Sequence, residues 1–89
     1  MKAIVTVIGK DTVGIIAAVC ALLSQHNVNV LDISQTVMQD YFTMIMMVDL
    51  TESSVSVAGL ASSLEQSGAE RGLSIRIQRE DIFNAMHRI

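Results

Sequence analysis

The hydrophobic side chains of this 89-residue sequence follow two spacings in turn, and the order of these spacings limits the folds that the chain can adopt. An every-second-residue pattern, which is typical of β-strands, occurs at residues 2–8, 29–38, 42–50 and 73–78. Helical spacing of apolar residues occurs at residues 14–25 and again from residue 57 to a terminating Gly72. The sequence therefore predicts the element order βαββαβ and indicates a small α+β fold.

Both predicted helices have an apolar face and recognisable ends. In the first helix the apolar residues at helical spacing are Val13, Ile16, Ala17, Cys20 and Leu23. In the second helix they are Val57, Leu60, Ala61, Leu64 and Gly68. Ser53, Ser54 and Ser56 precede the second helix and offer side-chain oxygens for its N-terminal cap. Each helix is thus expected to pack one face against a sheet.

The four strands are expected to form one antiparallel sheet. Residues 39–41 are short and polar enough to turn a hairpin between the second and third strands. Right-handed crossovers then place both helices on one face, with the first and third strands in the centre and the others at the edges. The residues expected to face the helices from the second and third strands are Leu31, Ile33, Val37, Phe42, Met44, Met46, Val48 and Leu50. This arrangement is the ferredoxin-like βαββαβ sandwich.

The chain is predicted to be a single domain, residues 1–89, with a core of residues 1–79 and a short C-terminal helix at residues 80–89. Four large apolar residues lie in that last segment: Ile82, Phe83, Met86 and Ile89. They are too apolar for a terminus that floats in water. The helix is therefore expected to dock either on its own domain or on a dimer mate.

Composition argues against several classes of function. The net charge is −3 and the six basic residues are mostly scattered, so no nucleic-acid partner is expected. The longest uncharged stretch is interrupted by polar residues before Leu31, so neither a membrane span nor a membrane partner is expected. The N-terminus lacks the pattern of a signal peptide, and a cytoplasmic location is predicted. The single cysteine, Cys20, is expected to be a small core residue.

Three functions that this fold supports do not match the residues present. A soft-metal carrier needs paired cysteines in its first loop, and an RNA-recognition module needs aromatic rings on its central strands. A small phosphatase needs an arginine in the first loop, where this chain has only Lys10 beside Asp11. No nucleophile with an adjacent base can be assembled from the sequence, so no enzymatic activity, metal or cofactor is predicted.

The stretch VIGKDTVGIIAAVCALLSQHNVNVLDISQ resembles the opening of an ACT domain, in the freestanding form related to glycine-cleavage repressor proteins. The ending IFNAMHRI resembles the tail of a small bacterial family of uncharacterised single-domain ACT proteins. The family motif has Asp or Asn, two variable residues and Gly, followed after fifteen positions by Asn; Asp11, Gly14 and Asn29 match it. The resemblance implies that Asp11, Thr12, Val13, Gly14 and Asn29 bind a ligand. Val13 departs from the family, which often has proline there.

Elementary chemistry supports a site at these positions. A helix N-terminus carries unpaired N–H groups and partial positive charge, and Gly14 would let a small carboxylate approach them. Asp11 could then hold the ammonium group of an amino acid, and Asn29 could bridge to either end. The alternative is that Gly9 and Gly14 only satisfy backbone angles, Asp11 caps the helix and Asn29 opens a strand.

The predicted function is a regulatory module that senses an amino acid or similar small carboxylate as a homodimer. The strand at residues 29–38 is a long edge with a single charge, Asp32, and no proline, whereas Arg76 and Arg79 protect the other edge. ACT domains often pair side by side, so the resemblance implies a ligand between the first loop of one copy and Asn29 of the other. The competing interpretation is a scaffold that binds a protein partner and has a vestigial ligand loop.

Overall fold

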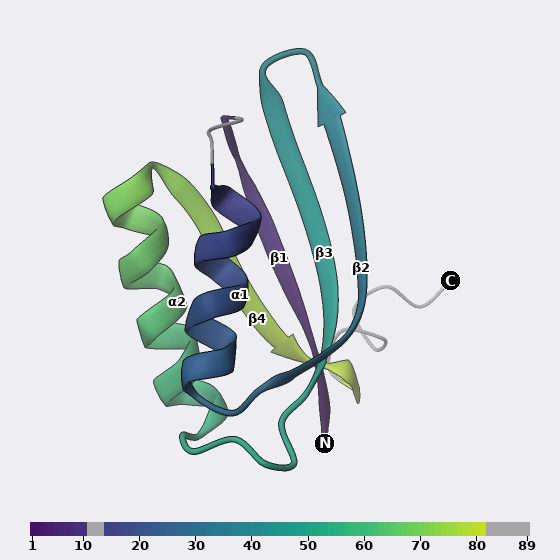
Figure 1. Ribbon diagram of the computed structural model, residues 1–89, viewed down its shortest axis with the longest axis vertical. Coiled ribbons are helices and arrows are strands. Elements are labelled where there is room, and N and C mark those ends of the chain that lie inside the picture. Colours follow the sequence, from purple (N-terminus) through teal and green to yellow (C-terminus); the bar gives the residue numbers. More distant parts are fainter. Residues whose placement is uncertain (11–13, 82–89) are drawn as a thin grey trace.

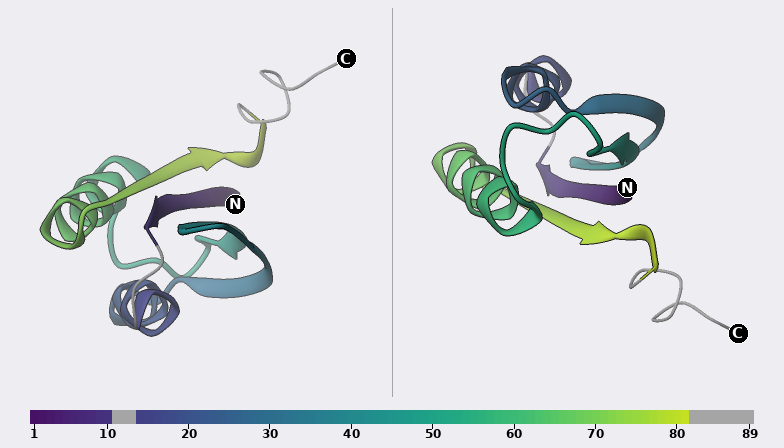
Figure 2. Two further views of the ribbon diagram at one scale, coloured as in Figure 1. Left: turned by 90° about the horizontal axis from the view of Figure 1, so that it is seen from above. Right: turned by 90° about the horizontal axis from the view of Figure 1, so that it is seen from below.

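The computed structural model describes residues 1–10 and 14–81 and has the predicted element order (Figure 1). Its elements are β1 (Lys2–Lys10), α1 (Ile15–Gln25), β2 (Asn29–Met38), β3 (Tyr41–Asp49), α2 (Val57–Arg71) and β4 (Leu73–Arg79). The four strands form one antiparallel sheet in the order β2-β3-β1-β4, and both helices lie on one face of it (Figure 2). The ferredoxin-like α+β prediction is confirmed, with β1 and β3 in the centre.

The core lies between the helices and the sheet. Every second residue of the two central strands points into it, and the five residues predicted for β3 and its end are all buried. The core cluster also contains the apolar faces of the helices and the start of β4: Ala3, Val5, Val7, Ile15, Val19, Leu23, Leu60, Leu64, Leu73 and Ile75. Burial of this set on one side of the sheet is the main source of stability for so small a chain.

The buried face of α1 differs from the one that the sequence predicted. Leu23 is buried as predicted, but its buried neighbours on the helix are Ile15 and Val19; Ile16 and Ala17 are exposed and Cys20 is only partly buried. Nearly every residue of α1 is apolar, so helical spacing alone could not select the packed face. The position of the helix on the sheet decides it instead.

The ends of α2 follow the sequence signals. The Ser56 hydroxyl oxygen accepts a hydrogen bond from the backbone N–H of Gly59 at 3.1 Å, which caps the first turn. Gly72 ends the helix at φ 71°, in the left-handed region that favours glycine. Along the packed face, Gly68 is buried against β4.

The β2–β3 hairpin turns on two residues, Gln39 and Asp40, and Gln39 has φ 55°. Tyr41 belongs to β3, so the predicted turn of residues 39–41 was one residue too long. Tyr41 pairs with Met38 across the hairpin and with Lys10 of β1, and this pairing extends the ladder to the turn.

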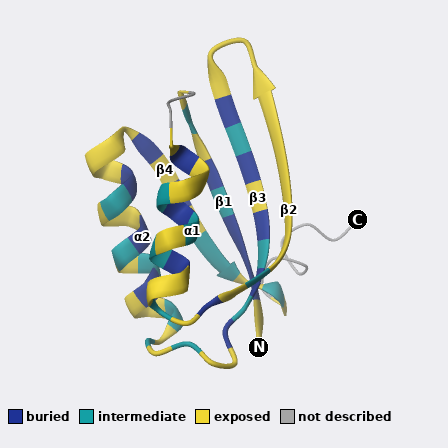
Figure 3. Ribbon diagram, in the orientation of Figure 1, coloured by how far each residue is buried: buried dark blue, intermediate teal, exposed yellow. Residues whose placement is uncertain are grey.

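The edge strand β2 is exposed on both faces from Leu31 to Met38 (Figure 3). The register shifts between Val30 and Asp32, which leaves Leu31 as a bulge. Val37 is 55% exposed although it lies on the same face as buried Phe42. The prediction that Leu31, Ile33 and Val37 are core residues was therefore wrong. The physical reason is that α1 has little contact with β2, so nothing in the described chain covers them.

Beyond β4 the described chain ends at Asp81, whose carboxylate accepts a hydrogen bond from Arg79 at 2.8 Å in an exposed ion pair. Residues 82–89, which include the apolar residues of the predicted C-terminal helix, lie outside the described residues. The C-terminal helix at residues 80–89 stays a prediction, and so does the extent of the single domain to residue 89.

Candidate functional site

The two described members of the predicted site lie at opposite ends of α1. Gly14 immediately precedes the helix, and Asn29 is the first residue of β2, which begins beyond the other end of the helix (Figure 1). An α-helix rises 1.5 Å per residue, so the 11 residues of α1 separate the two positions by roughly 16 Å. Asp11, Thr12 and Val13 lie outside the described residues. One chain therefore does not bring Gly14 and Asn29 around the same small molecule.

The N-terminal end of α1 is uncovered by residues 1–10 and 15–81. Gly14 has φ 85° and ψ 9°, and a Cβ built on it would meet no atom of these residues within 4 Å. It is exposed, and no side chain of the described residues forms a cap hydrogen bond there. The first turn also has no acidic residue that would neutralise the positive end of the helix dipole. No described side chain competes with an anion for this end of α1.

The two glycines of the first loop have different roles. The left-handed φ of Gly14 agrees with the backbone interpretation of that residue. Gly9 has an ordinary φ, but an added Cβ would lie 2.4 Å from a side-chain carbon of Leu73. Gly9 therefore permits close approach of β1 to the start of β4, and the prediction that it satisfies a special backbone angle was wrong.

The C-terminal end of α1 opens into a shallow polar cavity of about 480 Å³ beside Asn29. The lining residues are Ser24, Asn27, Val28, Asn29 and Glu52. The Leu23 and Ser24 carbonyls at the end of α1 accept backbone hydrogen bonds from the turn that follows, and the last turn has no basic residue. The Glu52 carboxylate is the charged group of the lining. The cavity thus favours a cation or an ammonium group.

Ser24, Asn27 and Glu52 were missed as candidates in the sequence. Asn27 was assigned only to the end of the first helix, and it does adopt φ 59° in the turn that follows α1. Glu52 lies in the loop after β3, and the turn is tied to that loop because the Ser54 backbone N–H donates to the His26 carbonyl at 2.9 Å. Only the fold brings the loop after β3 next to Asn29, so no local motif could have identified the cavity.

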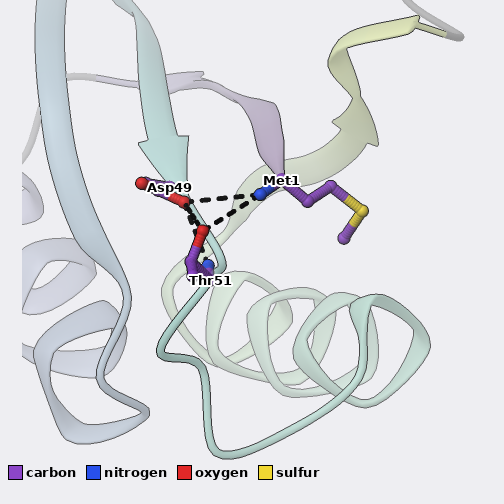
Figure 4. Close-up of polar contacts among 3 residues, drawn as sticks. All are labelled: Met1, Asp49 and Thr51. Atoms are coloured by element: carbon purple, nitrogen blue, oxygen red, sulfur yellow. Dashed lines mark hydrogen bonds and ion pairs between the residues drawn. The ribbon is translucent and has the colours of Figure 1, made fainter.

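Asp49 lies opposite Asn29 in the sheet and is held by a small polar cluster (Figure 4). Its carboxylate accepts hydrogen bonds from the Thr51 hydroxyl at 2.6 Å and the Thr51 backbone N–H at 3.0 Å. The Met1 ammonium lies 3.6 Å from the same oxygen and donates to the Thr51 hydroxyl at 3.1 Å. These hydrogen bonds, with a smaller contribution from the ammonium charge, hold the pKa of Asp49 below its usual value. The cluster fixes the end of β3, which pairs with Asn29 at the start of β2.

The described residues offer no metal centre. Among residues 1–10 and 14–81, no group of three or more His, Cys, Asp or Glu side chains is placed to hold a metal ion. In the same part of the chain, none of the helices combines the length and apolar character needed to cross a membrane.

Comparison with known proteins gives consistent matches. The UPF0237 protein of Bifidobacterium longum is 57% identical over 88 residues, which are 99% of this chain and 98% of that protein. The structure of an ACT domain protein from Streptococcus pneumoniae has a TM-score of 0.83 and 40% identity, with 98% of both chains covered. A crystal structure described as a glycine cleavage system transcriptional repressor has a TM-score of 0.76 over 88% of this chain and 44% of that one, at 22% identity.

The last of these likenesses, at its low identity, shows a shared fold only. The high-identity matches span almost the whole chain, and the sequence model of the ACT domain matches residues 2–78. The chain belongs to the ACT domain family.

Proposed function

We propose that this protein is a regulatory module that senses an amino acid or a similar small carboxylate, and that it acts in the cytoplasm as a homodimer. ACT domains are regulatory ligand-binding modules, which sets the class. The observation that carries the proposal is the position of Gly14 and Asn29 at opposite ends of α1, since a second copy must supply one of them. We keep the prediction that the protein is not an enzyme and has no cofactor.

The second copy is proposed to join at β2. This edge strand spans 10 residues, and its helix-side residues Ile33 and Val37 are large, apolar and exposed. Antiparallel pairing of β2 with its symmetry mate would bury them and extend the sheet, with α1 packed beside α1. Such a two-fold relation reverses the direction of α1, so the Gly14 end of one copy would approach the Asn29 end of the other.

The two helix ends would then supply opposite charges to one ligand. The N-terminus of α1 would hold the carboxylate, and Asn29 with Glu52 of the other copy would face the ammonium group. Asp11, Thr12 and Val13 remain proposed members of the site from the first loop, as the family motif implies. A zwitterion fits this pair of ends better than a simple anion does, because each end attracts one of its charges.

A thermal-shift screen against the twenty amino acids and common small acids tests the proposal. A ligand at a hundred times its dissociation constant should stabilise the native state by about 2.7 kcal/mol, which is easily measured. Asn29→Ala should abolish the shift, since it removes the side-chain amide and leaves the backbone pairing of β2 in place. Gln66→Ala, which alters an exposed amide on α2, should leave the shift unchanged.

The alternative function is a protein-interaction scaffold with a vestigial ligand loop. The exposed apolar residues of β2 favour it as much as they favour dimerisation, and Val13 in place of the family's frequent proline would make the loop less rigid. A dimer that shows no thermal shift with any small acid up to millimolar concentration would support the scaffold over the sensor.

A further inference from the structure

The outer face of the sheet, opposite the two helices, has a defined apolar region near the end of β4. No described element covers this face (Figure 2). Strand pairing aligns Gln78, Ile4, Met47 and Asp32 in one row across it. The next row contains Arg76, Thr6, Ile45 and Ser34, with the Arg76 charge on the β4 side and away from Asp32. The large apolar side chains of these two rows lie together on the central strands.

A shallow depression of about 160 Å³ lies over these rows. Its lining residues are Ile4, Asp32, Ile33, Ser34, Ile45 and Met47. Ile45 is 44% exposed at its rim. Asp32 is the single charged residue of the lining; one of its oxygens accepts a hydrogen bond from the next backbone N–H at 2.9 Å, and its side chain is exposed. The depression is thus an apolar hollow with one negative charge on its β2 side.

We propose that the C-terminal segment of the same chain, residues 82–89, docks in this depression. Four of its eight residues are large and apolar, and Ile82, Met86 and Ile89 have the i, i+4, i+7 spacing of one helix face. Arg88 supplies a positive charge that suits Asp32. The segment therefore matches the depression in both apolar character and charge.

The segment leaves the sheet close to the depression. Arg79 pairs with Ala3, so the chain leaves β4 within a residue or two of the row that contains Ile4. Crossing from β4 to β2 takes three strand spacings, or roughly 14 Å. An eight-residue helix spans about 12 Å, which is enough to cover Ile4 on β1 and Met47 on β3. The long side chain of Arg88 must bridge the remaining distance to Asp32 on β2. Pairing of two copies at the β2 edge would leave this face free.

A single tryptophan can report docking because the chain contains none. In Phe83→Trp the fluorescence emission should be blue-shifted relative to the same substitution in a free peptide of residues 80–89. Adding Ile45→Glu should return the emission to that of the peptide, because the charge lies in the depression. Adding Ile8→Glu should leave it blue-shifted. Ile8 is the matched control, since it lies on the same face and is 48% exposed, but it is four residues along β1 from Ile4.

Exchanging the charges of Arg88 and Asp32 tests whether these two residues attract each other. It also gives a second test of docking in a protein that keeps Phe83, in case the tryptophan itself prevents docking. Arg88→Asp should increase the rate of proteolytic cleavage in the tail, and Asp32→Arg added to it should restore protection. Peptide-like emission of Phe83→Trp together with an Arg88→Asp cleavage rate equal to that of the unsubstituted protein would overturn the proposal. A blue shift that appears only as protein concentration rises would also overturn it, since the occupant would then be a second copy.

Discussion

Gly68 shows how one missing side chain fixes the contact of α2 with β4. A Cβ at this position would lie 2.7 Å from the Leu73 carbonyl oxygen and 3.1 Å from a side-chain carbon of Ile75. The nearer atom belongs to the backbone and cannot rotate away, so helix and strand would have to separate. Gly59, in the first turns of the same helix, has only ordinary contacts at 3.5 Å and beyond. The same substitution is therefore expected to have opposite effects at the two positions.

Gly68→Ala should lower the free energy of unfolding by about 1–3 kcal/mol, the usual cost of overpacking a buried contact. Gly59→Ala should raise it by about 0.5–1 kcal/mol, because alanine has the higher helix propensity. Urea denaturation of both variants measures the difference. Equal destabilisation by the two changes would show that the close approach of α2 to β4 is not what requires glycine at position 68.

The Asp49 cluster makes a prediction about acid stability. Because the pKa of Asp49 is lowered in the folded state, its contribution is present above the unfolded pKa and is lost as pH falls through the folded one. Thr51→Val removes the hydroxyl donor and should reduce the melting temperature slightly at neutral pH, since the group is exposed. The difference between the variant and the unsubstituted protein should shrink as pH falls through the lowered pKa of Asp49 in the folded state. Thr51→Ser, which keeps the hydroxyl, should behave like the unsubstituted protein at every pH.

At the scale of elements, the periodicity of the sequence predicted the strands and their order because period-2 and period-3.6 patterns are local. The Ser56 cap and the Gly72 ending of α2 were predicted for the same reason. The packed face of α1 was not, since an apolar residue at almost every position leaves no contrast for a local rule. The exposure of β2 was also missed, because the width of the sheet that α1 covers is a property of the assembled fold.

Because the helix-side residues of β2 are exposed, a charge placed there can disrupt the proposed dimer without disrupting the core. Val37→Lys places a charge on the helix side of the open edge, where the proposed partner would pack, and should shift the protein from dimer towards monomer. Thr36→Lys places the same charge one residue away on the outer face, and should leave the dimer intact. Sedimentation at micromolar concentration measures both. A monomeric unsubstituted protein would contradict the pairing and the ligand site shared across it.

At the scale of the whole molecule, the candidate site could be predicted only as a set of positions. The motif identified Gly14 and Asn29, and the helix predicted between them already placed the two positions at its opposite ends. The cavity beside Asn29 includes Glu52 from a loop far along the sequence, which no spacing rule connects to the first helix. The information that the sequence lacked was the three-dimensional proximity of Asn29 and Glu52, which are distant along the chain.

The central position of β1 also determines when the protein can fold. The first strand pairs with the last, from Gly9 opposite Leu73 to Ala3 opposite Arg79, so one edge of β1 stays open until nearly the whole chain exists. During synthesis that edge of β1 waits for β4, and contacts between such distant segments close slowly. A ribosome-bound fragment that ends before β4 can pair β1 with β3 but leaves the other edge of this apolar central strand unpaired.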